Sequence, residues 1–593
     1  MTEKVVLDGG SLTIEDLARI ARDPRVQVEI HPEAWTRVEA SRAQIEALTA
    51  KYVKEREAGE RPVLEYGVTT GFGEFKNLPI APERLEELQR NILLSHSAGA
   101  GETADPGNPA NYFEPDVVRA ALVIRLNVFL KGHSGIRAAM VRAVQAMLNQ
   151  GIVPLVPIRG SVGSSGDLCP LAHLFVVLLG EGRYYVVREP GDLCHQAREL
   201  RGGLEQLGED LGIDEIPSPS YKEGLALTNG ATFSAALLAL GVHDGGNLGH
   251  TADVATALSL EAVCGCARAF DPRVHQVRGL AGQIASAANI RDLIRGSQLI
   301  ERAGAVQDLY SLRSAPVVHG AFRDTLAYAR QVAAAEINAA ADNPLFFPAD
   351  EVRPFDWEFA ANWPEGYDGR ERISYSASNF HGEPVGMAAD VLAIGLAELA
   401  NISERRVQML LDSRQNRNLP SNLIPLRGIN SGLMILQYAA AGIVSENKVL
   451  AHPATVDSIP TAANSEDHNA MATIAARKLR TVLRNAQTVL AIELLVAAQA
   501  VEWRVAMEID PVRPRPDAPT DWDQADREAE LFEQRTRPEQ RDGIATKLGE
   551  GTRRAYLAVR EVAETMLRDR VLEGDIRSVR GILEQTAWPA LSD

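Results

Sequence analysis

The chain has 593 residues, with 61 lysines and arginines against 79 aspartates and glutamates, and its formal net charge is −18. This acidic balance argues against a nucleic-acid-binding or membrane-surface protein, and the length is sufficient for a large hydrophobic core. The 4 cysteines are too few for a disulfide framework. The N-terminus lacks the pattern of a signal peptide and we find no apolar run long enough to span a bilayer, so we expect a cytoplasmic protein.

The first hundred residues predict helices separated by one glycine-rich loop. Helical periodicity runs from Ser11 to about Leu48, with a cap-like start at residues 11–15. Three glycines among β-branched and aromatic residues at 65–73 predict a loop, and Tyr66 stands at its mouth. Residues 88–99 predict a helix that ends in small residues and carries His96. By residue type alone, Tyr66 is interpreted as packing at a turn and His96 as a core histidine.

The segment Gly160-Ser161-Val162-Gly163-Ser164-Ser165-Gly166-Asp167-Leu168 has the composition of an ordinary loop. It matches neither a phosphate-binding Walker A loop nor a Gly-x-Ser-x-Gly nucleophile elbow. The order Ser164-Ser165-Gly166 nevertheless allows a reaction within the backbone. If a tight turn presses the Gly166 nitrogen onto the Ser164 carbonyl carbon, a five-membered ring closes with loss of water, and the Ser165 hydroxyl leaves as a second water. The product is a methylidene-imidazolone, an electrophile that no ordinary side chain provides.

The middle of the chain offers two polar motifs. Asn229-Gly230, at the start of an Ala/Leu-rich helical run through Leu258, is by itself a turn signal. Gln307, Tyr310 and Arg313 recur at three-residue spacing, so in a helix they project from one face before Pro316 stops it. A polar stripe at this spacing is usually a solvated face, but an arginine fork with a phenol donor is also what a carboxylate pocket requires.

Long Ala/Leu-rich patterns at 385–405, 433–450 and 471–505 predict a helix bundle rather than an α/β layer. Asn343-Pro344 predicts a helix stop before them. The neighbouring residues Glu466-Asp467-His468 cannot easily converge on one ion, so we predict no metal site. Residues 348–372 look like an insertion, and the polar tract at 510–551 is interpreted as a flexible or arching insertion before a last helix near Thr552.

Several ordered blocks resemble the aromatic amino acid ammonia-lyase family, which includes histidine and phenylalanine ammonia-lyases and related aminomutases. Residues 160–168 resemble its signature, and residues 66–73 resemble its Tyr-Gly-x-x-Thr-Gly-Phe-Gly loop. Residues 307–313 resemble its Gln-Asp-x-Tyr-Ser-x-Arg block, and residues 379–381 its Asn-Phe-His motif. The usual triad is Ala-Ser-Gly, and this chain departs from it at Ser164. The ring takes only backbone atoms from that residue, so a small serine is chemically tolerable there.

The resemblance implies an internal methylidene-imidazolone formed from the triad and no external cofactor. It implies that residues 125–135 are scaffold beneath the triad, that Tyr66 removes the β-proton as a tyrosinate with a lowered pKa, and that Arg313 binds the substrate carboxylate with Asn229 and Asn343. The catalytic residues that it implies are Tyr66, Ser164, Ser165, Gly166 and Tyr310. The substrate-binding residues that it implies are His96, Asn229, Gln307, Arg313, Asn343, Phe380 and Glu466.

Two positions favour an imidazole substrate. Ser95-His96 aligns with a position where histidine-specific members carry Ser-His, and a carboxylate at Glu466 is able to accept an imidazole N–H. Histidine-specific members carry Gln-Glu-Asp-His here, and this chain departs at Ser465. We therefore expect ammonia elimination from L-histidine to give urocanate. A phenylalanine or tyrosine lyase or aminomutase is the alternative, and a catalytically inactive helical assembly protein is the alternative outside enzymes.

The expected fold class is all-α, with a long central helix bundle and a mixed, loop-rich N-terminal part that carries the electrophile. The expected division is an N-terminal part at 1–225, the bundle at 226–508, and a C-terminal polar insertion with helices at 509–593. The resemblance implies a homotetramer whose active sites are shared between subunits. The expected partner is a small amino acid substrate, with no nucleic acid and no membrane.

Overall fold

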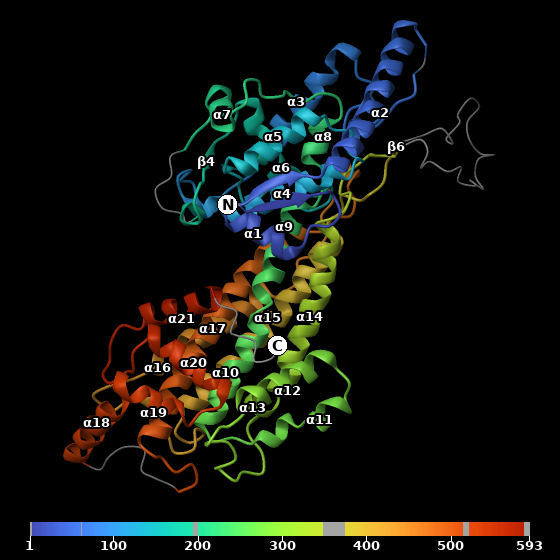
Figure 1. The fold of residues 1–593 in the computed structure, drawn as a ribbon. Coiled ribbons are helices and arrows are strands. Elements are labelled where there is room, and N and C mark those ends of the chain that lie inside the picture. Colours follow the sequence, from blue (N-terminus) through green and yellow to red (C-terminus); the bar gives the residue numbers. More distant parts are fainter. Residues whose placement is uncertain (1–2, 61, 194–199, 348–373, 514–520, 586–593) are drawn as a thin grey trace. The chain divides into compact units, whose positions relative to one another are not determined.

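The computed structural model describes residues 3–60, 62–193, 200–347, 374–513 and 521–585, and it is mainly helical (Figure 1). The predicted all-α class is confirmed, since the strands are only two to four residues long. The chain packs as two compact units of interleaved segments. Unit 1 comprises residues 1–243, 330–389 and 453–477, and unit 2 comprises residues 244–329, 390–452 and 478–593. The expected division into three consecutive parts stays a prediction.

Unit 1 is built around helix α4, Pro115–Leu130, which is buried on nearly all sides. A helix with hydrophobic residues on all its faces occupies the interior of a large protein, and α4 also buries Arg119, Arg125 and Asn127 there. Helix α1, Ile14–Arg22, packs against α4 with its buried face, and Thr13 caps its start by accepting from the Asp16 N–H at 3.0 Å. Helix α2, Pro32–Glu57, and helix α5, Ala138–Asn149, also contact α4.

Three helices of unit 1 meet near the loop at residues 160–168. Helix α3, Leu85–His96, packs on helix α6, Leu168–Phe175, and on helix α8, Glu223–Thr228. The strands of unit 1 form short pairs: β1, Lys4–Leu7, is parallel to β2, Gln27–Ile30, and β3, Ile152–Pro154, is antiparallel to β4, Tyr184–Val186. A third pair, which is antiparallel, joins β5, Leu345–Phe346, to β6, Ser374–Tyr375, in the register Leu345 to Tyr375. Helix α7, Leu204–Leu211, contacts α5.

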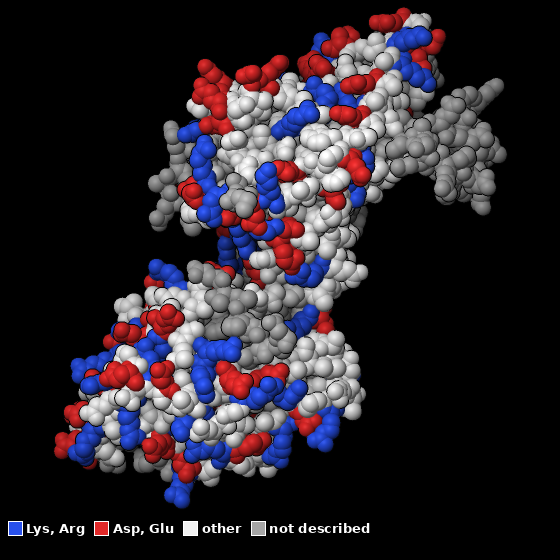
Figure 2. Space-filling model, viewed as in Figure 1, with Lys and Arg blue, Asp and Glu red and all other residues white. Residues whose placement is uncertain are grey.

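Unit 2 is a helical bundle. Helix α10, Leu248–Ala262, contacts helix α12, Ala281–Leu293, and helix α20, Glu550–Val562. Its other helices are α11, Pro272–Gln276; α13, Tyr310–Arg313; α16, Met434–Leu450; α18, Trp522–Thr536; α19, Arg541–Ala545; and α21, Glu573–Gln585. Acidic and basic side chains are interspersed on the face that Figure 2 shows.

Among the described helices, those that contribute residues to both units are α9, Thr232–Gly245; α14, Ala315–Glu336; α15, Glu383–Leu411; and α17, Ala472–Ala506. The predicted helices at 385–405, 433–450 and 471–505 are confirmed as α15, α16 and α17. The predicted stripe on α17 is buried, because the side chains stepping by four and three from Ala475 through Leu479, Val482 and Ala486 to Val489 are each 0% exposed.

The expectation that the chain has no apolar run of membrane-spanning length needs correction for helix α15. Within the described ranges, α15 is the one helix long and apolar enough to cross a membrane by length and composition. However, 72% of its apolar window is buried inside the protein. The core helix of a water-soluble protein passes the same test of length and composition, so the apolar window does not make α15 a membrane span.

Other predictions need correction. The helical pattern at 11–48 is interrupted by β2, and Gln307 precedes α13 instead of sharing its face. The predicted end before Pro316 is confirmed, since α13 ends at Arg313, but Pro316 also lies in the first turn of the next helix, α14, where its missing N–H has no partner to lose. The polar tract at 510–551 contains α18 and α19, because α18 buries Phe532, which stacks on Trp503 at 4.0 Å. The predicted insertion at 348–372 lies outside the described residues.

Candidate active site

The glycine-rich loop at 65–73 holds the phenol of Tyr66 at a cavity. Gly67 has φ +68°, and a Cβ there would lie 2.4 Å from Leu225 Cδ2, so glycine allows the loop to press on α8. The Tyr66 hydroxyl accepts a hydrogen bond from the Gly73 N–H at 3.3 Å. The sequence correctly predicts a loop with a close backbone approach.

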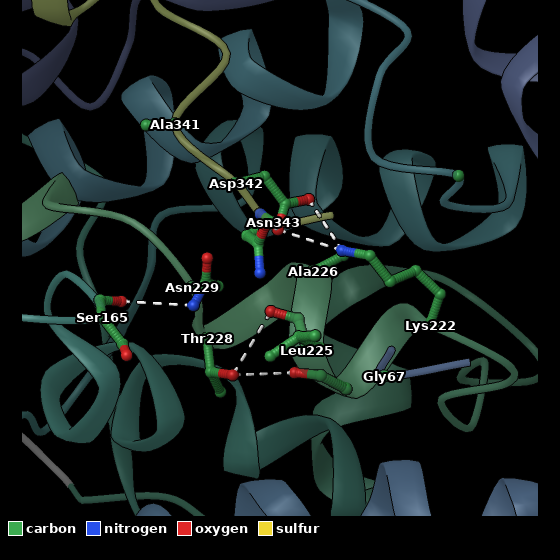
Figure 3. Close-up of polar contacts among 12 residues, drawn as sticks. Gly67, Ser165, Lys222, Leu225, Ala226, Thr228, Asn229, Ala341, Asp342 and Asn343 are labelled. Atoms are coloured by element: carbon green, nitrogen blue, oxygen red, sulfur yellow. Dashed lines mark hydrogen bonds and ion pairs between the residues drawn. The ribbon is translucent and has the colours of Figure 1, made fainter. Parts of the chain in front are cut away.

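The loop at residues 160–168, named the electrophile loop after the group expected from its triad, is held against Asn229-Gly230 by hydrogen bonds to its backbone. The Ser165 carbonyl oxygen accepts from the Gly230 N–H at 3.2 Å and from Asn229 Nδ2 at 3.3 Å (Figure 3). The Asp167 N–H donates in turn to the Gly230 carbonyl at 2.8 Å. Gly166 has φ +75°, and a Cβ on it would lie 2.0 Å from the Gly230 carbonyl carbon. Only glycine fits at Gly166.

A fully buried carboxylate, that of Asp167, anchors the electrophile loop through several hydrogen bonds. It accepts from Ser161 Oγ at 2.9 Å, from the Ser234 N–H at 2.8 Å and from Ser234 Oγ at 3.0 Å, and the Thr473 hydroxyl also donates to it. Burial raises the pKa of Asp167, while these donors lower it. The sequence did not predict these donors to Asp167, because its only indication of them is the aspartate that follows the triad.

Glu466 reaches the electrophile loop from a distant part of the chain. Its Oε1 accepts from Ser165 Oγ at 2.5 Å, and its Oε2 accepts from Thr461 Oγ1 at 2.5 Å. Thr461 also pairs with Glu466 through the backbone, since its N–H donates to the Glu466 carbonyl at 3.0 Å. Thr461 was not predicted, because a single threonine in a loop gives no sequence signal.

His96 lies at the C-terminal end of α3. Its Nδ1 is 3.0 Å from Ser95 Oγ, so Ser95 fixes one ring nitrogen. Burial lowers the pKa of His96, which keeps the imidazole neutral near pH 7. A neutral imidazole is able to donate or accept a hydrogen bond at its other nitrogen.

Several of the side chains described above line one cavity of about 550 Å³. Its polar lining includes Tyr66, His96, Ser165, Asn229 and Glu466, and apolar side chains such as Phe72, Ile92 and Leu225 complete it. A second cavity of about 330 Å³ lies on the electrophile loop and is lined by Ser164, Ser165, Gly166 and Thr461 among others. A mostly apolar pocket with a few convergent polar groups is the usual form of a small-molecule site.

The remaining predicted site residues do not line either cavity. Asn343 is 5% exposed, and its Oδ1 accepts from the Ala377 N–H at 2.8 Å. Phe380 is half-buried in the turn before α15. Gln307, Tyr310 and Arg313 belong to unit 2, where Tyr310 is 72% exposed and the Arg313 guanidinium lies 4.6 Å from its ring centroid.

Tyr66 does not have the lowered pKa predicted from the sequence. Burial raises the pKa of Tyr66, the Gly73 N–H lowers it, and the Glu466 carboxylate raises it further. The net direction is upward, because one backbone donor does not offset desolvation of a phenolate beside a negative charge.

The fold and this constellation of glycine-held serine, phenol, imidazole and carboxylate define an amino acid lyase. A family model described as aromatic amino acid lyase matches residues 12–519, and the chain belongs to this family.

Individual relatives make the comparison more specific. A histidine ammonia-lyase of Caldanaerobacter subterraneus subsp. tengcongensis is 41% identical over 584 residues, covering 98% of this chain and 96% of the relative. The crystal structure of histidine ammonia-lyase from Trypanosoma cruzi matches with a TM-score of 0.76 and 34% identity, covering 99% of this chain and 94% of that one. A tyrosine aminomutase from Streptomyces globisporus matches with a TM-score of 0.77 and 31% identity, covering 98% and 97% of the two chains.

Proposed function

We propose that this protein is a histidine ammonia-lyase, which eliminates ammonia from L-histidine to give urocanate. The observation that carries the proposal is that His96 and Glu466 line the same cavity as Tyr66 and Ser165. An imidazole ring is both a donor and an acceptor, and this wall offers it a carboxylate and a second imidazole. The relative that is 41% identical across nearly the whole chain carries this name.

We propose that Ser164, Ser165 and Gly166 cyclise to a methylidene-imidazolone. The local structure fits this group, because Gly166 has the left-handed backbone and tight packing that a side chain would prevent. Two donors, Asn229 Nδ2 and the Gly230 N–H, face the Ser165 carbonyl oxygen and would stabilise negative charge there. When present, the group supplies an electrophilic methylene that turns the substrate's amino group into a leaving group.

Glu466 has two successive roles in this proposal. In the uncyclised chain its Oε1 accepts from the Ser165 hydroxyl, which must depart as water. Loss of that hydroxyl frees Oε1 to accept an N–H of the substrate's imidazole ring. Thr461 keeps the other oxygen engaged and thereby fixes the carboxylate plane.

Tyr66 is the proposed base for the β-proton of the substrate. It lies in the cavity with Ser165, and the Gly73 N–H is placed to stabilise its phenolate oxygen.

Asn229 Oδ1 is buried and has no hydrogen-bond partner among the described residues, so it suits a donor such as the substrate's ammonium group.

We propose that the substrate carboxylate is bound by Arg313 with Asn229 and Asn343, that Gln307 and Tyr310 complete the site, and that Phe380 lines it. Gln307, Tyr310 and Arg313 belong to unit 2, whereas Tyr66 and the electrophile loop belong to unit 1. We also propose a homotetramer with active sites shared between subunits, as the family resemblance implies. The proposed location is the cytoplasm, which fits the acidic composition of the chain.

The test is incubation of the purified protein with L-histidine, L-phenylalanine and L-tyrosine, followed by ultraviolet absorbance. We expect urocanate from L-histidine and no cinnamate or coumarate. Formation of cinnamate alone would refute the choice of substrate. A β-amino acid product would instead identify an aminomutase, a reaction that the similarity to tyrosine aminomutase makes worth measuring.

A further inference from the structure

A fully buried ion pair lies on the far side of Asn229 from the electrophile loop. Lys222 precedes α8, and its Nζ lies 3.0 Å and 3.1 Å from the two carboxylate oxygens of Asp342. Both side chains are 0% exposed. Taking two charges out of water costs free energy that their mutual attraction often fails to recover. Stability alone is therefore a weak explanation for this pair.

A second buried cation, Arg125 of α4, joins the pair to the backbone around it. Its guanidinium donates to the carbonyl oxygens of Asn229 at 2.6 Å and of Ala341 at 2.9 Å, and also to that of Ala226. It lies 3.8 Å from Asp342. One side chain thus ties the end of α8 to the segment that precedes Asn343.

The cluster of Arg125, Lys222 and Asp342 holds both asparagines that are proposed to bind substrate. Asp342 Oδ1 accepts from the Asn343 N–H at 2.7 Å, and Arg125 holds the Asn229 carbonyl. The Asn229 side chain then points the other way and donates to the Ser165 carbonyl oxygen. Figure 3 shows Asn229 and Asn343 between Ser165 on one side and Lys222 on the other.

We infer that Arg125, Lys222 and Asp342 form a positioning cluster that fixes the amides of Asn229 and Asn343 for the substrate's carboxylate and for the Ser165 carbonyl oxygen. The inference rests on the proposed function. Two cations against one carboxylate leave one net positive charge in a dry interior, which favours an anion next to the two amides. The cluster itself does not touch the substrate.

The test compares two ligands of the mature enzyme that differ in the carboxylate: urocanate, which has one, and imidazole, which has none. For Lys222→Met we expect the inhibition constant of urocanate and the KM for L-histidine to rise about ten-fold, because the two amides would be less well placed for the carboxylate and one positive charge behind them would be lost. The inhibition constant of imidazole should stay within about two-fold. A merely structural defect would weaken both ligands alike, and that result would overturn the inference.

Arg137→Met is the matched control, because Arg137 pairs at 2.6 Å with the buried Glu223 of the same helix α8. It should lower the melting temperature while leaving the preference for urocanate over imidazole unchanged. If Lys222→Met does not fold, Lys222→Met/Asp342→Asn removes both charges of the pair and keeps the cluster's net charge. If the double variant keeps the wild-type preference for urocanate over imidazole, the positioning role is overturned.

The proposed function and the inference fail in different ways. Absence of L-histidine turnover in the wild-type protein would refute the proposed function. Turnover in the wild type with an unchanged urocanate constant in Lys222→Met would refute only the inference.

Discussion

At the scale of single residues, Ser164 differs from the rest of its loop. It is 4% exposed and lines the smaller cavity, and its hydroxyl makes no hydrogen bond within the described ranges. The adjacent Ser165 hydroxyl, by contrast, donates to Glu466. The proposed ring uses only the backbone of Ser164, so the structure gives no reason why serine replaces alanine there.

The raised pKa of Tyr66 predicts how the lyase rate depends on pH. A phenol must lose its proton to act as a base, and burial beside Glu466 moves this loss to higher pH than for a free tyrosine. We therefore expect kcat/KM for L-histidine to rise steadily from pH 7 to about pH 10. Glu466→Gln removes the repelling charge and should shift the profile to lower pH. A rate that falls above pH 8 would contradict the assignment of Tyr66 as the base.

At the scale of single elements, the sequence predicted the long helices better than the short ones. Helices α15 and α17 carry many apolar positions at helical spacing, so their burial follows from composition. Helix α13 has only four residues, and its limits depend on tertiary contacts instead of periodicity. The prediction that Gln307 shares its face failed for this reason.

Helix α6 carries a histidine that makes stability depend on pH. Burial lowers the pKa of His173 to about 4, and its Nε2 accepts from the Gly99 N–H at 3.0 Å. The folded chain keeps this imidazole neutral, whereas the unfolded chain takes up a proton below the ordinary pKa of 6.5. Stability is therefore lost as the pH falls, by about 2 kcal/mol between pH 7 and pH 5.

Chemical denaturation at the two pH values measures this loss, with His173→Gln as the control. Glutamine is able to accept a hydrogen bond from the same N–H without titrating. The variant's free energy of unfolding should therefore fall less between pH 7 and pH 5 than that of the wild type, by about 2 kcal/mol. An equal loss in both proteins would rule out His173 as the source.

At the scale of the whole molecule, the candidate site combines segments far apart in the chain. The resemblance supplied Tyr66, His96, the triad, Asn229 and Glu466. The structure brings Tyr66, His96, Ser165, Asn229 and Glu466 to one cavity, and Ser164 and Gly166 line the second. The resemblance did not supply Thr461 or the buried partners of Asp167 and Asp342, because a supporting side chain has no motif of its own. Their importance follows only from contacts between segments that the sequence does not place side by side.

The most direct test of the account is the intact mass of the purified chain. We expect wild type and Ser164→Ala each to weigh less than their sequences by two water molecules, and both to release urocanate from L-histidine. Ser165→Ala lacks the hydroxyl that leaves as the second water, so its mass should fall below that of its sequence by at most one water, and it should stay folded and lose turnover. A wild-type chain that has its full sequence mass yet eliminates ammonia, or a Ser165→Ala variant with unchanged turnover, would contradict the account.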